Sequence, residues 1–190
     1  MVILAQRAFT AQDLSDIQNN ANSIRTSMTE AFKDEGQYPE DVGGIVGLTK
    51  STIAASALDT PIVTLVKLGK ISPDESFNGI SNDAFQITSA RLDDTTSQNK
   101  AFLLVVNGLE TEECRNLISE MGNQWDYVEA LSAGASAGTT VALTDRNLSG
   151  ATSTTVLKTM TSPEIAAAAI VNDAVCSGAG AVNGVIFGSK

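Results

Sequence analysis

The sequence predicts an α+β fold in which one long N-terminal α-helix packs on an antiparallel β-sheet, with short helices at the periphery. Residues 2–35 contain neither glycine nor proline, and their apolar residues recur every three or four positions. From residue 84 onward, apolar segments of strand length alternate with short segments that carry helix-capping signals. A chain of 190 residues can bury one hydrophobic core, so a single domain over residues 1–190 is expected.

The first segment is predicted to be an amphipathic helix. Its apolar residues from Leu4 to Ala31 share one face, and the opposite face is polar and is expected to meet water or a neighbouring molecule. Gly36 and Pro39 make continuation of the helix costly. About thirty helical residues extend roughly 45 Å. Because a domain of this size is narrower than that, part of the helix is expected to project from the body.

The other elements are predicted from local signals. Residues 40–57 are expected to form a loop with one short helical piece. Helices are expected at 60–69 with Thr60 as the cap, at 72–75 with a capping box, at 110–121 and at 162–175. Strands are expected at 84–89, 101–106, 125–131 and 184–188, the first two paired antiparallel and the last in the centre of the sheet. Residues 132–155 are mostly Ser, Ala, Gly and Thr, and only 140–143 has a strand-like pattern.

Charge and composition exclude several classes of function. The formal net charge of −10 opposes binding to nucleic acid and to anionic membranes. The chain has no histidine, which removes the commonest catalytic base and metal ligand, so neither a cofactor nor a metal is expected. Residues 134–138 match the Gly-X-Ser-X-Gly pattern of a hydrolase nucleophile, but no histidine can activate the serine. The sequence therefore predicts that the chain is not an enzyme.

Cys114 and Cys176 are either two buried thiols or one disulfide bond, and the acidic, Ser/Thr-rich composition favours the disulfide and an oxidising compartment. Such a bond closes a loop of about sixty residues, which corresponds to about 4 kcal/mol of stability. No run of 18 apolar residues is present, so no segment is predicted to span a membrane. The first residues do not form a signal peptide, and any targeting segment is expected to be missing from this chain.

Several short stretches occur in a defined order: LAQRA at 4–8, YP at 38–39, LGKIS at 68–72, NKAF at 99–102, GL at 108–109, MG at 121–122 and VIFGS at 185–189. Together with the two cysteines, this series resembles the toxin-coregulated group of type IVb major pilins. Within that group, it is most similar to the colonisation-factor and longus pilins of enterotoxigenic bacteria. The resemblance implies the type IV pilin fold.

The resemblance also implies a function. Such a chain is expected to be the major structural subunit of a type IVb pilus, polymerising with identical subunits into a helical filament for adhesion, autoaggregation and intestinal colonisation. A minor pilin and a secreted adhesin are further expected partners. The expected location is the bacterial surface, after anchoring of the full-length protein in the inner membrane. A minor pilin or a secretion-system pseudopilin is the alternative.

The resemblance assigns regions and residues. Residues 1–35 are the C-terminal half of the pilin's long helix, 36–100 the αβ-loop region, and 114–176 a variable region bounded by the disulfide. The hydrophobic N-terminal half of the helix is expected to be absent, with Met1 an added start. Leu68 and Glu75 are expected to meet the first helix of a neighbouring subunit. Arg7 is either a solvated charge or the partner of Glu75 across that interface.

Overall fold

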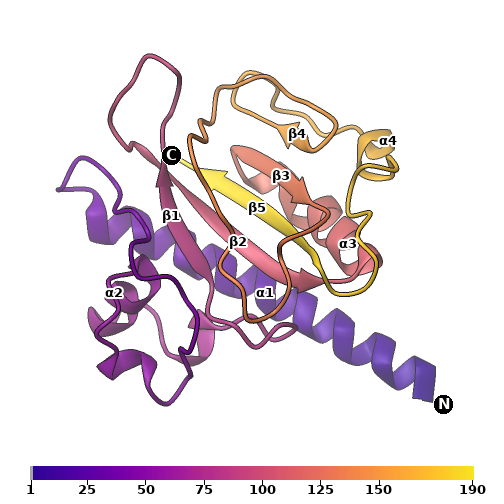
Figure 1. The fold of residues 1–190 in the computed structure, drawn as a ribbon, viewed down its shortest axis with the longest axis horizontal. Coiled ribbons are helices and arrows are strands. Elements are labelled where there is room, and N and C mark those ends of the chain that lie inside the picture. Colours follow the sequence, from indigo (N-terminus) through magenta and orange to yellow (C-terminus); the bar gives the residue numbers. More distant parts are fainter. Residues whose placement is uncertain (1) are drawn as a thin grey trace.

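The structure is a computed structural model that describes the backbone of residues 2–190 and the side chains of residues 10–190. The predicted α+β class is confirmed (Figure 1). The helices are α1 (Val2–Phe32), α2 (Pro61–Lys67), α3 (Thr111–Met121) and α4 (Ala167–Ile170), with single 3-10 turns η1 (Ile53–Ala55), η2 (Asp74–Ser76) and η3 (Gly122–Gln124). The strands are β1 (Gln86–Ala90), β2 (Ala101–Leu109), β3 (Tyr127–Leu131), β4 (Val156–Lys158) and β5 (Asn183–Ser189).

The five strands form one sheet in the order β1-β2-β5-β3-β4, and every neighbouring pair is antiparallel. The last strand of the chain inserts between β2 and β3, which confirms the central position predicted for residues 184–188. In this position β5 bonds to both neighbours and is buried along its whole length. Its continuous apolar run is typical of a strand whose two faces are both covered.

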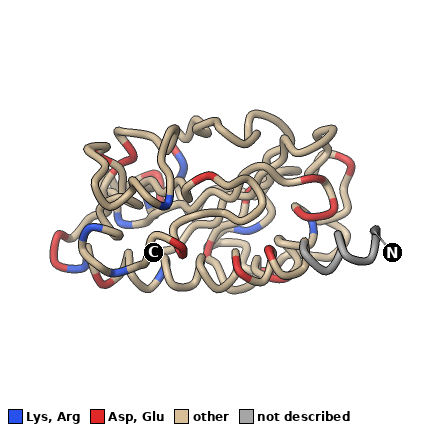
Figure 2. Tube along the Cα trace, turned by 90° about the horizontal axis from the view of Figure 1, so that it is seen from below, with Lys and Arg blue, Asp and Glu red and all other residues tan. Residues whose placement is uncertain are grey.

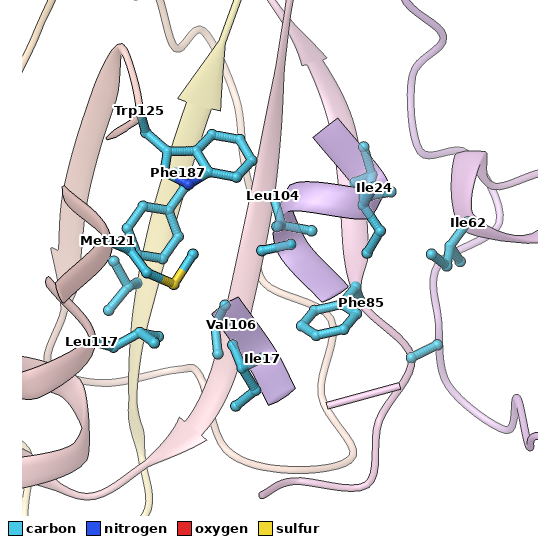
Figure 3. Close-up of a cluster of buried hydrophobic side chains, with 14 of the residues drawn as sticks. Ile17, Ile24, Ile62, Phe85, Leu104, Val106, Leu117, Met121, Trp125 and Phe187 are labelled. Atoms are coloured by element: carbon cyan, nitrogen blue, oxygen red, sulfur yellow. The ribbon is translucent and has the colours of Figure 1, made fainter. Parts of the chain in front are cut away.

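One face of the sheet, called the inner face below, packs against α1 and α3 (Figures 1 and 3). The strands contribute alternate residues such as Leu104, Val106 and Phe187, and α1 contributes Ile17 and Ile24, all with no exposed surface. Residues three or four apart on α1 point the same way, so a single stripe of the helix enters this core. The sequence pattern therefore predicted this layer correctly.

The other face of the sheet, the outer face, is covered by residues 132–163, apart from strand β4 within them, rather than by a long helix (Figure 1). A second cluster forms here, in which Leu103 and Ile186 of the sheet meet Leu148 of the covering segment. The cover approaches the sheet closely at Gly184 of β5. A Cβ atom at Gly184 would lie only 2.8 Å from the Cβ atom of Ala135 in the covering segment, so a larger residue there would force the layers apart.

The helix predicted for 162–175 is wrong except for one turn, α4. The Ser162 amide bonds to the Thr159 carbonyl at 3.1 Å, in an isolated β-bridge, instead of starting a helix. Most of the alanines that follow are exposed, and Ile165, Ala169 and Ile170 pack against the core but are only partly buried. Because short helices depend on packing of an apolar face, this segment has little to stabilise it as a helix.

Two smaller predictions also need correction. Thr60 precedes α2 as expected, but its buried hydroxyl makes no capping bond and has no partner within the described residues. The strand predicted for 140–143 is not paired with another strand. Instead, the carboxamide of Gln86 donates to the Val141 carbonyl at 2.8 Å and accepts from the Val141 amide at 2.9 Å. This side chain separates the two main chains, so no ladder forms between them.

Candidate subunit interface

Helix α1 presents two contrasting stripes. Its inward stripe is apolar, and Ile17, Ala21, Ile24 and Met28 have no exposed surface. Its outward stripe between residues 12 and 30 is polar but mostly uncharged, and consists of Gln12, Ser15, Asp16, Asn19, Asn22, Thr26, Thr29 and Glu30. A surface of small neutral groups can be buried against another chain without the desolvation penalty that charged groups carry.

Arg25 fastens α1 to the end of the sheet. Its Nε donates to the Ser189 hydroxyl at 2.9 Å, and another guanidinium N–H donates to the Gln124 carbonyl. The guanidinium also lies 5.1 Å from the centre of the Trp125 ring, within the range of a cation–π contact. These contacts hold the guanidinium of Arg25 against the end of the sheet, although its side chain is still 32% exposed.

Glu75 and Leu68 flank α1 on the side of α2. Glu75 Oε2 accepts from the Ser72 amide at 2.8 Å, and the Glu75 amide donates to the Ser72 hydroxyl at 3.3 Å, so the predicted capping box is present. The bond from the Ser72 amide lowers the pKa of Glu75, with a smaller contribution from the hydroxyl of Ser23 on α1. The carboxylate is therefore held ionised beside α1. Leu68 is 56% exposed at the C-terminal end of α2.

The third predicted interface residue cannot be placed in the same way. Arg7 belongs to α1, but its side chain lies outside the described residues. The structure brings Glu75 next to its own α1, while the pairing of Glu75 with Arg7 of another molecule stays a prediction.

Cys114 and Cys176 form the favoured disulfide bond, with 6.0 Å between their Cα atoms. Cys114 is on the buried face of α3, whose N-terminus carries a capping box between Glu110 and Glu113. Arg115 of the same helix donates to the carbonyls of Asn172 and Val175. The bond and these contacts attach the chain before β5 to the helical layer.

Three exposed apolar side chains were missed by the sequence analysis. Val42, Val46 and Val171 are 75%, 59% and 62% exposed. The first two lie in a glycine-rich loop whose other apolar residues, Ile45 and Leu48, enter the core. The signal was present as an apolar run from 42 to 48, but the run does not reveal which of its residues point outward.

Within the described residues, no group of three or more acidic or cysteine side chains is arranged to hold a metal ion. In the same residues, no helix combines the length and the apolar character needed to cross a membrane.

Comparison with known proteins identifies relatives. The family model for the toxin-coregulated pilus subunit TcpA matches residues 64–188. A toxin coregulated pilin of Vibrio cholerae is 33% identical over 138 residues, which are 71% of this chain and 54% of that protein. The toxin coregulated pilin of a V. cholerae serotype O1 El Tor strain is 31% identical over 128 residues, 67% of this chain and 51% of that protein. The chain thus spans about half the length of these relatives.

A solved structure supports the same relation. The crystal structure of TcpA, a type IV pilin from V. cholerae El Tor biotype, superposes with a TM-score of 0.67 at 25% sequence identity. The match covers 94% of this chain and 99% of that chain, so nearly all of the elements described above have counterparts.

Proposed function

This chain belongs to the family of toxin-coregulated pilus subunits, as the resemblance of its sequence predicted, and we propose that it is the major structural subunit of a type IVb pilus. The relatives are pilins, which agrees with the prediction that the chain is not an enzyme. The likeness to the pilins of enterotoxigenic bacteria stays a prediction. The proposed site of action is a filament on the bacterial surface.

The proposal rests mainly on the form of α1. Its N-terminal turns extend past the sheet, while its apolar stripe is buried and its neutral stripe is exposed (Figure 1). In the proposed filament, the exposed stripe packs against neighbouring subunits. Leu68 and Glu75 lie beside α1 and would meet the first helix of a neighbour, where Glu75 pairs with Arg7. A filament needs contacts of this kind, between two different surfaces of the subunit. A contact between two identical surfaces closes after two subunits and cannot extend the filament.

The region bounded by the disulfide, residues 114–176, is proposed to face outward from the filament. Residues 132–163 of this region lie on the side of the sheet opposite α1 (Figure 1). If α1 faces other subunits, this side faces solvent, other filaments and host surfaces. Adhesion, autoaggregation and colonisation are proposed on this basis, with a minor pilin and a secreted adhesin as further partners.

Charge reversal tests the subunit contact. The variants Arg7→Glu, Glu75→Arg and their combination are made in the complete gene product, in cells that carry the pilus-assembly machinery. Each single change places like charges together and is expected to reduce fibres strongly, while the double change restores part of them. Electron microscopy counts the fibres. Asp74→Arg is the matched control, since its side chain is 87% exposed in the same turn and outside the proposed pair.

The same micrographs distinguish the alternatives. Long, abundant fibres made of this chain identify a major pilin, whereas a minor pilin or a pseudopilin does not give them. Fibres of normal number in Arg7→Glu would rule out the pair between Arg7 and Glu75. A complete absence of fibres containing this chain in the wild type would rule out the major-pilin assignment.

A further inference from the structure

The segment that covers the outer face of the sheet is almost uncharged. Residues 132–163 hold three charged side chains, in a chain whose net charge is −10. Arg146 pairs with Glu129 at 3.1 Å, and Lys158 is 6% exposed with its ammonium bonded to two carbonyls. Asp145 is thus the one charge of this segment that is left in solvent. In Figure 2, the layer opposite α1 is mostly free of charged residues.

Within this cover, residues 140–144 behave as a strand that lacks a partner strand. Their exposure alternates, with Val141 buried, Leu143 partly buried, and Thr140, Ala142 and Thr144 exposed. Val141 directs both main-chain groups at the carboxamide of Gln86. Because successive residues of a strand direct these groups to opposite sides, those of Thr140 and Ala142 point away from Gln86.

The main-chain groups of Thr140 and Ala142 that point away from Gln86 have no hydrogen-bond partner among the described residues. In the part of the chain that the structure describes, neither the amide nor the carbonyl of Thr140 or Ala142 makes a hydrogen bond. The Thr144 carbonyl accepts one bond, from Arg146 at 3.0 Å, and keeps a second lone pair. Exposed strand edges are usually protected by lysine, proline or a bulge, because they otherwise pair with another chain. The sequence Thr-Thr-Val-Ala-Leu-Thr at 139–144 contains no lysine or proline.

The charge distribution favours a second copy of this chain as the partner. Two molecules of charge −10 repel each other wherever their acidic surfaces approach. The neutral cover is a surface on which two copies can meet with little of this repulsion, and the strand edge within it includes the β-favouring residues Thr140, Val141 and Thr144. We propose that residues 140–144 of two copies pair as antiparallel strands about a twofold axis, with Ala142 opposite Ala142 and Thr140 opposite Thr144.

The place of this contact in an assembly of subunits rests on the proposed function. In a filament whose α1 helices face inward, the cover faces outward, and a twofold contact there joins subunits of two adjacent filaments. A contact of this kind closes after two subunits and therefore does not extend a filament. It links filaments side by side, and many weak copies along their length act together.

Two substitutions at one residue test the pairing. Ala142→Lys brings two like charges together at the axis, and Ala142→Pro removes the outward amide; each is expected to weaken dimerisation of the 190-residue chain at least about tenfold. Ala151→Lys is the matched control, because Ala151 is exposed in the same cover outside the strand. Sedimentation equilibrium at up to millimolar concentration measures the association, and thermal unfolding shows that the variants remain folded.

Three results would overturn the pairing: a wild-type chain that stays monomeric, an Ala142→Lys chain that dimerises normally, or an equal loss in Ala151→Lys. The last would assign the effect to net charge alone. In cells, Ala142→Lys is expected to leave the number of fibres unchanged and to abolish their bundles. Dimerisation that is sensitive to Ala142, in a chain that builds no fibres, would support the pairing and contradict the proposed function separately.

Discussion

The two faces of the sheet are buried by different means. On the inner face, α1 and α3 supply large apolar side chains, and Ile24 and Phe187 belong to the same core without exposed surface. On the outer face, an irregular segment lies over the sheet, and polar groups are buried with the apolar ones. Tyr127 donates to Glu129 Oε2 at 2.7 Å, and Arg146 holds both oxygens of the same carboxylate.

The contacts on the two faces therefore have different effects. Those of the inner face mainly stabilise the fold, and those of the outer face mainly fix the position of the covering segment. Burial of apolar surface stabilises the inner layer without regard to direction. Hydrogen bonds and ion pairs contribute less net free energy, but they require particular atoms at particular places. The outer cover therefore owes its path over the sheet to a few polar contacts, and the inner layer owes its stability to area.

The largest expected effect comes from the disulfide bond, whose two cysteines both belong to the inner core. Replacing both Cys114 and Cys176 by serine is expected to lower the free energy of unfolding by about 4 kcal/mol, since the 62-residue separation leaves a long loop unconstrained in the unfolded chain. Guanidinium unfolding measures the change. A loss far smaller than this would mean that the disulfide constrains the unfolded chain much less than the length of its loop predicts.

A pair of truncations compares the two layers directly. Ile24→Ala on α1 is expected to cost about 3 kcal/mol, because the inner core is closed on all sides and leaves a cavity. Val141→Ala in the cover is expected to cost about 1 kcal/mol, because Val141 is at the margin of the smaller cluster. Urea unfolding gives both values, and the reverse order would contradict the division into a stabilising and a positioning layer.

Loss of the ion pair between Arg146 and Glu129 in the outer layer is the next largest expected effect. Arg146→Met leaves the Glu129 carboxylate, whose side chain is 10% exposed, without its cation and is expected to cost about 2 kcal/mol. We expect a smaller loss of stability than for a fully buried ion pair, since the Arg146 side chain is 28% exposed. The control is the double variant Arg146→Met with Glu129→Gln, which removes both charges. If the double variant is no more stable than the single one, an unpaired charge is not the cause.

The smallest effect concerns high pH. Burial, with the nearby Glu129 charge, raises the pKa of Tyr127 above its ordinary value of 10.0. The folded chain therefore keeps the phenol proton after the unfolded chain has lost it, so the contribution of Tyr127 to stability does not change with pH below about pH 10 and falls above it. Urea unfolding at about pH 9 and about pH 11 is expected to show this fall, and Tyr127→Phe to reduce it. An unchanged fall in the variant would assign it to other groups.

The inner layer could be predicted from the sequence because its signals are local. The spacing of Ile17, Ile24 and Met28 defines a helical stripe, and the apolar run 184–188 indicates a strand covered on both faces. The capping box at 72–75 and the acidic first turn at 110–113 indicated helix starts that are present in the structure. The lack of histidine also limited the classes of function on chemical grounds alone.

The outer layer could not be predicted, since its contacts are distant in sequence and depend on single side chains. Nothing near residue 141 indicates that Gln86, 55 positions away, takes the place of a strand. β4 has only three residues, too few for a pattern, and it was missed. Of the predicted interface residues, Leu68 and Glu75 came from family resemblance, and the physical pattern of the sequence alone did not single them out.

Thiol labelling of intact filaments tests the central claim, that the α1 side of the subunit faces other subunits and the cover faces solvent. Single cysteines are introduced as Asn19→Cys on the exposed stripe of α1 and as Ala151→Cys on the cover, with the native disulfide retained. Both are expected to react with a maleimide in the isolated chain. In filaments, Ala151→Cys is expected to react as before and Asn19→Cys to be protected; equal reactivity of the two would contradict the account.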